Sequence, residues 1–312
     1  MAETMDNVVT FLTASYPFAS ELQAFGIALQ GAMAVRNGAN KDGKMHWFHA
    51  FALTTLLAFG GGWFGFLLMG KPTSMITGGD VNVTCCVIAF LAVNYTPLDI
   101  GYKILSSFPG KIFVTIFAQM FRCTGTIKFI NTGFQEISPT PYYPIPVIGP
   151  ILYGTMLGNM GGFFVKGFDG YLKNGVPWPF QNGIFIGTFY HLFANDKEGV
   201  LGTNLRSIVK SVVDGEQMFG LDDTTFAHVV MASFMLITGV IMLPEFFGPS
   251  FSPIAEPAFW LGRSLSSKLV TSESSSVKRI PSPERTPEAS VNGSAASAGK
   301  KGKNKRKKKK TA

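Results

Sequence analysis

Arg122 is the residue of this sequence best placed to do chemistry from inside an apolar segment. It lies midway along Lys111–Thr132, within Phe121-Arg122-Cys123-Thr124-Gly125. A charge at that depth is costly, and such a group is a candidate functional residue by default. Two interpretations stay open. Arg122 either pairs structurally with a buried carbonyl or carboxylate, or it binds an anion or lines a pore, since its planar fork suits phosphate.

A second charged pair lies at Asp99 and Lys103, around the stretch Pro97-Leu98-Asp99. The spacing of four residues lets the two side chains form an ion pair at a helix end. Lys128 follows Arg122 by about 1.7 turns, so these two need not share a helix face. Asp99, Lys103, Arg122 and Lys128 are therefore the candidate pore or gating residues.

Two glycine clusters could shape the surroundings of Arg122. Gly60-Gly61-Gly62 and Gly161-Gly162 are each followed by two aromatic residues, one hundred positions apart, and Gly158 shortly precedes the second cluster. Each glycine costs a helix about 1 kcal/mol relative to Ala. In a membrane such clusters let helices pack closely, or they break a helix so that N–H and C=O groups face a ligand. Three successive glycines favour a kink.

Seven segments are candidate membrane spans, because a span needs about 20 mainly apolar residues to cross a core of about 30 Å. The first is weakened by Glu21, Gln23 and Gln30, and the sixth is short. We therefore expect an all-α integral membrane protein with seven transmembrane helices. The segments are Phe18–Val35, His46–Met69, Val81–Leu105, Phe108–Thr132, Pro144–Val165, Pro179–Ala194 and Thr225–Phe247.

The glycine clusters occupy matching positions in two blocks of three spans, which predicts an internal repeat. Three is an odd number, so the second block enters from the opposite face and the repeat is inverted, with the seventh helix outside it. Such folds place their functional site near the midplane between the halves. We expect a lumenal N-terminus (1–17), repeats at 18–107 and 108–195, a lumenal loop (196–224), the seventh span (225–247) and a tail (248–312).

The charge is unevenly distributed along the 312 residues. The net charge is +8, but Leu261–Ala312 holds fourteen Lys/Arg against three Asp/Glu, whereas Met1–Trp260 holds thirteen against sixteen. A basic tail on a slightly acidic body is not the pattern of a nucleic-acid-binding domain. The three cysteines are too few for a disulfide scaffold. No nucleotide-binding glycine loop, nucleophile motif or metal-ligand spacing is present, so we expect neither an enzyme nor a metal site.

Loop charges predict the orientation. The connections Arg36–Lys44, Lys103–Lys111 and Lys166–Lys173 are basic, whereas Asn195–Asp223 carries six acidic residues against three basic ones and is long enough for a short helix. By the positive-inside rule the basic connections are cytosolic, so the N-terminus is lumenal and the tail is cytosolic. The composition of the tail predicts disorder. Its Lys309-Lys310 resembles a dilysine signal for retrieval to the endoplasmic reticulum.

Several motifs resemble those of the trimeric intracellular cation channel family. The most specific is Asn94-Tyr95-Thr96-Pro97-Leu98-Asp99-Ile100-Gly101-Tyr102-Lys103, followed by Phe108–Lys111, and Gly70-Lys71-Pro72 and Phe168-Asp169-Gly170 add to it. The resemblance covers about Phe18–Phe247. It implies a homotrimer with one pore in each subunit. It also implies conduction of potassium ions across the endoplasmic or sarcoplasmic reticulum, as counter-ion flow during calcium release.

The resemblance further implies that the lipid phosphatidylinositol 4,5-bisphosphate lies in each pore. A lysine and an arginine of the fourth span and the glycine kinks would hold its phosphates. Matched by position, the arginine is Arg122 and the kinks are Gly60–Gly62 and Gly158–Gly162. Ala118 stands at the lysine position, either by natural divergence or by substitution. A charge-assisted hydrogen bond is worth about 1.5–3 kcal/mol, so we expect weaker lipid retention here.

Two classes of function stay open. In a cation channel, the lipid phosphate would neutralise Arg122, because a bare arginine would repel the permeant ion. The alternative is a secondary transporter of a small solute, with alternating access at the repeat interface. A seven-span receptor would have no use for the repeat. Unitary currents distinguish the first class from the second.

Overall fold

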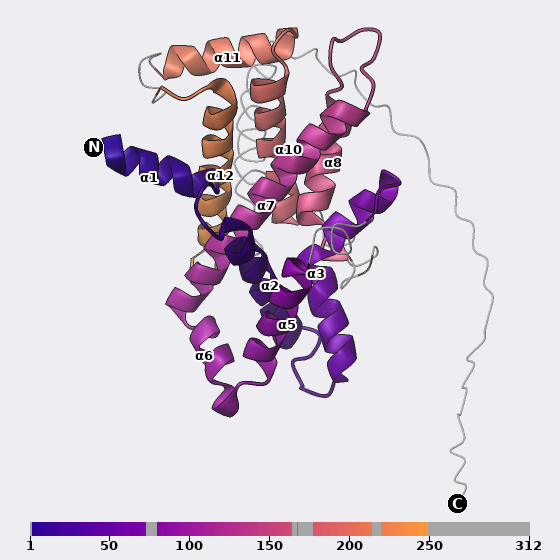
Figure 1. Ribbon diagram of the computed structural model, residues 1–312, viewed down its shortest axis with the longest axis vertical. Coiled ribbons are helices and arrows are strands. Elements are labelled where there is room, and N and C mark those ends of the chain that lie inside the picture. Colours follow the sequence, from indigo (N-terminus) through magenta and orange to yellow (C-terminus); the bar gives the residue numbers. More distant parts are fainter. Residues whose placement is uncertain are drawn as a thin grey trace, which may run out of the picture. The chain divides into compact units, whose positions relative to one another are not determined.

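A computed structural model of the chain (Figure 1) describes residues 2–72, 80–163, 167, 177–213, 220–246 and 248. These residues all belong to one compact unit, Met1–Leu261. Every regular element among them is helical, which confirms the predicted all-α class. The dilysine Lys309-Lys310 and the predicted tail after residue 248 lie outside the described residues, as do Phe168-Asp169-Gly170 and Lys173.

The helices follow the predicted spans in chain order. The first half of the chain holds α1 (Ala2–Leu12), α2 (Ala19–Asn37), α3 (Trp47–Leu68), α5 (Val81–Asn94), the short 3-10 helix η1 (Pro97–Asp99) and α6 (Ile100–Ser106). The second half holds α7 (Phe108–Glu136), α8 (Ile148–Asn159), α10 (Trp178–Tyr190), the π-helical turn η2 (His191–Asn195), α11 (Val200–Val212) and α12 (Asp223–Ile241).

Within the described part of the chain, two helices are long and apolar enough to cross a membrane by themselves, namely α3 and α12. The helices α5 and η1–α6 qualify together, across a bend of 87°. By contrast, α2 and α7 are long enough but too polar, and α8 and α10 have only 12 and 13 residues. Two or three spans are therefore evident from length and composition, and the count of seven stays a prediction.

The helices pack as two groups of three. In the first group α2 packs against α3 and α5, and in the second group α7 packs against α8 and α10. The groups meet where α2 crosses α7 and where α3 crosses α8. The first helices of the two groups, α2 and α7, thus contact each other, and so do the second helices, α3 and α8. This arrangement agrees with the predicted internal repeat, and α12 packs on α7 and α10 outside it.

Small residues allow the close approach of α2 to α7. A Cβ added at Gly26 would lie 2.4 Å from the Cβ of Phe117, a distance that no side chain tolerates. Ala28 and Ala118 are fully buried in the same apolar cluster. Small residues at helix crossings are typical of membrane bundles, where close van der Waals packing replaces the hydrophobic effect between helices.

Contacts between helix ends divide those ends into two sets. In one set, Arg36 at the end of α2 pairs with Asp99, and Lys111 at the start of α7 pairs with Glu245 after α12. In the other set, Lys71 after α3 pairs with Glu136 at the end of α7. These pairings agree with the predicted alternation of the connections between two faces. The cytosolic assignment of the first face stays a prediction from the loop charges.

The predicted lumenal loop carries a helix, α11, which runs across the ends of α10 and α12 (Figure 1). Its Leu205 and Val209 pack against the apolar core. The fully buried carboxylate of Asp196 accepts hydrogen bonds from the backbone N–H groups of Gly199 and Gly202, each at 2.9 Å. These bonds satisfy first-turn donors that have no partner inside the helix and hold α11 in place.

Candidate functional site

Arg122 lies on α7 at its crossing with α2, and it is half-buried. Its Nη2 donates a hydrogen bond of 2.7 Å to Oε1 of Gln30 on α2. The predicted buried charge is therefore held at the contact between the two three-helix groups. This is the place where a fold built from repeated halves positions its functional residues.

Further polar side chains of α2 and α7 lie along the same crossing. The hydroxyl of Thr124 donates to Oε1 of Gln23 at 3.0 Å, and Gln23 is 3% exposed. From the sequence, Gln23 and Gln30 were expected only to weaken the first span. Their separation of seven residues, two helical turns, puts both amides on one face of α2. That spacing was the signal by which they could have been found.

Ala118 lies one turn before Arg122 on α7 and is fully buried in the cluster between α7 and α2. Residues four apart share a helix face. A lysine at position 118 would therefore begin on the face that carries Arg122. The alanine instead contributes apolar packing and no charge, so Arg122 is the one cation of this pair of positions.

The helix is not broken at the first glycine cluster, and a kink there stays a prediction. The helix α3 continues from Trp47 to Leu68 through Gly60, Gly61 and Gly62, and Gly60 and Gly61 are buried. At the second cluster the chain does leave the helix, because α8 ends at Asn159 and Gly161-Gly162 form a turn. Packing explains the difference, since a buried helix can keep its glycines in the α conformation when neighbouring helices cover them.

The second glycine cluster contacts both α3 and α7. A Cβ added at Gly161 would lie 2.1 Å from the carbonyl oxygen of Leu57 on α3, and one at Gly158 would lie 2.1 Å from Oγ1 of Thr126 on α7. Glycine is required at both positions because the neighbouring atoms leave no room for a side chain. The cluster therefore serves close packing as well as ending the helix.

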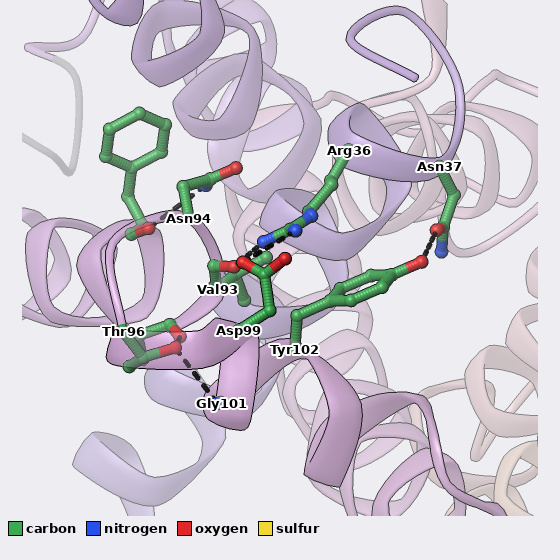
Figure 2. A network of polar contacts seen from close by, with 10 residues as sticks. Arg36, Asn37, Val93, Asn94, Thr96, Asp99, Gly101 and Tyr102 are labelled. Carbon is green, nitrogen blue, oxygen red and sulfur yellow. Dashed lines mark hydrogen bonds and ion pairs between the residues drawn. The ribbon is translucent and has the colours of Figure 1, made fainter. Parts of the chain in front are cut away.

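Asp99 has a different partner from the one that its spacing predicts. Its carboxylate forms an ion pair of 2.9 Å with Arg36 at the end of α2, and no contact with Lys103 is found among the described residues. Arg36 also donates to the carbonyl oxygen of Val93, and its guanidinium lies 4.1 Å from the centre of the Tyr102 ring. Figure 2 shows the guanidinium between these groups. A contact across the fold has replaced the local pair.

The bend between α5 and α6 is built around this network. Leu98 and Asp99 both have positive φ, at 55° and 59°, which is the left-handed region that side chains other than glycine seldom adopt. The hydroxyl of Thr96 accepts a hydrogen bond of 2.9 Å from the N–H of Gly101, the second residue of α6 (Figure 2).

The other two candidate pore or gating residues, Lys103 and Lys128, are both exposed. Neither has a described contact with Arg122.

Arg36 and Tyr102 also line a cavity of about 490 Å³ beside this bend. Its other polar and aromatic walls include Asn94, Lys41 and Trp47. None of the residues predicted to bind a lipid phosphate lines it.

Comparisons with known proteins agree with this arrangement. The sequence profile of the TRIC channel family matches residues 36–182. No sequence among the curated proteins matches the chain. A solved trimeric intracellular cation channel from C. elegans, in the absence of Ca²⁺, has the same fold with a TM-score of 0.54 and 14% sequence identity. The match covers 77% of this chain and 97% of that channel.

Two other solved TRIC channels overlap with TM-scores of 0.47. One is the C. elegans channel with bound Ca²⁺, at 16% identity over 72% of this chain and 90% of its own. The other comes from a study of conductance through TRIC cation channels, at 14% identity over 73% of this chain and 92% of its own. The chain is thus similar to the TRIC channels in two ways: the family profile matches just under half of its length, and the C. elegans channel in the absence of Ca²⁺ shares its fold.

Proposed function

We propose that this protein is a monovalent cation channel with one pore in each subunit of a homotrimer. The observation that carries the proposal is the polar row at the α2–α7 crossing, where Gln23, Gln30, Arg122 and Thr124 line the contact between two apolar helix groups. Polar and ionisable groups inside a membrane bundle mark ion or substrate paths. TRIC family members are ion channels rather than enzymes, which gives this path its class.

In the proposed channel, Arg122 holds the phosphate of an anionic lipid and does not itself conduct. Its fork can form two parallel hydrogen bonds to one phosphate, and the bound negative charge would remove the repulsion between the guanidinium and a passing potassium ion. The lipid class proposed here is a phosphoinositide such as phosphatidylinositol 4,5-bisphosphate. Because Ala118 supplies no second cation, the affinity of this site for the lipid should be about tenfold or more below that of a site with both charges.

Planar-bilayer recording of the purified full-length chain tests the channel. A potassium gradient should produce discrete unitary currents, with a reversal potential close to the potassium equilibrium value. Saturable solute flux strictly coupled to another solute, with no unitary current, would instead establish the alternative, a secondary transporter. That alternative is kept because paired helix groups such as α2–α7 and α3–α8 also occur in transporters.

We also propose that the channel lies in the endoplasmic or sarcoplasmic reticulum, with its N-terminus in the lumen and its tail in the cytosol, where it carries counter-ion flow during calcium release. The loop charges and Lys309-Lys310 support this assignment. Imaging of the full-length protein should show reticular staining, and the K309A/K310A variant should move toward the cell surface. Native mass spectrometry tests the trimer.

A further inference from the structure

Five buried polar atoms on α7, α8 and α10 have no hydrogen-bond partner among the described residues. They are Oγ1 of Thr126, Oγ1 of Thr155, Oδ1 of Asn159 and both amide atoms of Asn182. Thr126 and Thr155 are fully buried, Asn182 is 1% exposed and Asn159 is 8% exposed. A buried polar group without a partner costs roughly 1–3 kcal/mol. Such a concentration in one three-helix group indicates a ligand that satisfies these atoms together.

Glycines on α10 let the side chains of Thr126, Thr155 and Asn159 approach that helix, on which Asn182 lies. A Cβ added at Gly187 on α10 would lie 3.3 Å from Cδ1 of Ile130, 3.7 Å from Oγ1 of Thr155 and 3.9 Å from Cγ2 of Thr126. A Cβ at Gly183, the neighbour of Asn182, would lie 2.5 Å from Nδ2 of Asn159. The three helices therefore meet at these polar groups beside Ile130 of α7, and α10 inserts no side chain between them at these two positions.

The hydroxyls of Thr126 and Thr155 also differ from those of other helical threonines in this chain. A threonine in an apolar helix usually donates to the carbonyl four residues earlier. Thr126 and Thr155 do not, so their hydroxyls are free to serve a ligand between the helices. The threonines that do make this bond in the described helices include Thr54, Thr55, Thr132, Thr188 and Thr238.

The electrostatics of this place favour a cation over an anion. The helix α8 ends at Asn159, so the partial negative charge of its last carbonyl groups lies beside the cluster. Unwound helix ends of this kind coordinate sodium or protons in transporters. Two charged side chains of α7 flank Thr126: Arg122, one turn before it, whose described hydrogen bond goes to Gln30 on α2, and Lys128, two residues after it, which is exposed.

The oxygen atoms available in this cluster favour a monovalent cation over a divalent one. Hydroxyl and amide oxygens are neutral ligands, which resemble the carbonyl rings that replace the hydration shell of potassium in channels. Calcium and magnesium sites use carboxylates, and none of these four residues has one. We propose that a dehydrated monovalent cation, of potassium or sodium size, binds among Thr126, Thr155, Asn159 and Asn182. This inference rests on the proposed function, since it gives the permeant ion a binding site between α7, α8 and α10.

Thermal unfolding of the purified full-length chain tests the site without requiring any current. The midpoint should be several degrees higher in potassium or sodium chloride than in N-methyl-D-glucamine chloride at the same ionic strength, because a ligand that binds only the folded state raises its stability. The T126V/T155V double variant keeps the side-chain shapes but removes both hydroxyls, and it should lose this difference. Equal midpoints in the three salts for the unaltered protein would overturn the proposal.

A matched control is Thr54→Val. The hydroxyl of Thr54 is also fully buried but donates 2.9 Å to the carbonyl of Ala50, so this variant should keep the dependence on the cation. If the double variant also keeps it, the site is not where we place it. If the double variant fails to fold, thallium replaces potassium in crystals of the unaltered protein. Anomalous density among the four residues would then support the site, and its absence would overturn it.

Bilayer recordings separate the failure of this site from the failure of the channel. Unitary currents together with cation-independent stability would overturn the site alone. Cation-dependent stability without any unitary current would overturn the proposed channel and leave a structural ion site. If both hold, T126V/T155V should change the unitary conductance or the potassium-to-sodium selectivity at least twofold, and Thr54→Val should not. Equal effects of the two variants would overturn the role of the site in permeation.

Discussion

Arg122 on α7 and Gln30 on α2 are joined by a hydrogen bond of 2.7 Å, although 92 positions separate them in the chain. The bond links the first helix of one three-helix group to the first helix of the other. Gln30 is a neutral acceptor, so this bond satisfies one N–H of the guanidinium and leaves its charge in place. The position of that charge at the crossing makes it the most direct point to test by mutation.

Arg122→Ala should remove phosphoinositide from the purified protein, because the cationic fork that is proposed to hold the phosphate is lost. Lipid mass spectrometry should show at least a tenfold decrease relative to the unaltered chain. Lys128→Ala, which removes an exposed lysine of the same helix, should leave the lipid content as it was. A lipid content that does not depend on Arg122 would refute the proposed phosphate site.

Ala118→Lys should strengthen lipid retention, since a lysine there starts from the face of α7 that carries Arg122. The expected gain is about tenfold, from one added charge-assisted hydrogen bond. The same change should lower the stability of the lipid-free protein, because Ala118 is fully buried in an apolar cluster, where an ammonium group without a phosphate partner is costly. Ala118→Met has similar length without the charge and is the control. Equal lipid retention by the two variants would mean that position 118 does not face the phosphate.

Asp99→Asn should cost less than about 1 kcal/mol of unfolding free energy, because the Asp99 side chain is 52% exposed and exposed ion pairs are weak. Asparagine also tolerates the left-handed backbone at this position. Arg36→Ala should cost more, since Arg36 is 21% exposed, donates to the carbonyl oxygen of Val93 and lies over the ring of Tyr102. A double-mutant cycle by denaturation in detergent measures the coupling. Equal losses for the two single variants would show that Arg36 acts through Asp99 alone.

The loss of unfolding free energy at acid pH should depend on Asp222, the N-cap of α12. Hydrogen bonds from Thr225, and then from the N–H of Thr224, lower the pKa of this carboxyl below its ordinary value. A lowered pKa means that the stabilisation is complete above the unfolded-state pKa of about 3.9 and is lost as the pH falls through the folded-state value.

The variant Asp222→Asn isolates that charge, since asparagine caps a helix about as well as aspartate. The difference in unfolding midpoint between the unaltered protein and Asp222→Asn should be constant from about pH 5 to 7 and should shrink below about pH 4. A difference that stays constant down to pH 2.5 would show that the carboxylate charge contributes nothing to the cap.

The all-α class of the protein and the presence of a charge inside an apolar segment, at Arg122, could be predicted from the sequence by itself. Apolar length and an isolated charge inside an apolar segment are local properties, which any fold must accommodate at the same energetic cost. The order of the helices and the presence of a helix in the loop before α12 follow from the same local pattern. The family resemblance around Pro97-Leu98-Asp99 also needed no coordinates, because it rests on contiguous residues.

The partners of the charges were decided by the tertiary structure. Asp99 could have paired with Lys103 on its own helix, but the packing of α2 against α5 presents Arg36 instead. The glycines of α3 could have broken their helix, as those after α8 do, but α3 stays continuous. The cluster of Thr126, Thr155, Asn159 and Asn182 became visible only when α7, α8 and α10 were packed together. Such contacts join residues far apart in the chain, and their energies depend on distance in space rather than on spacing in sequence.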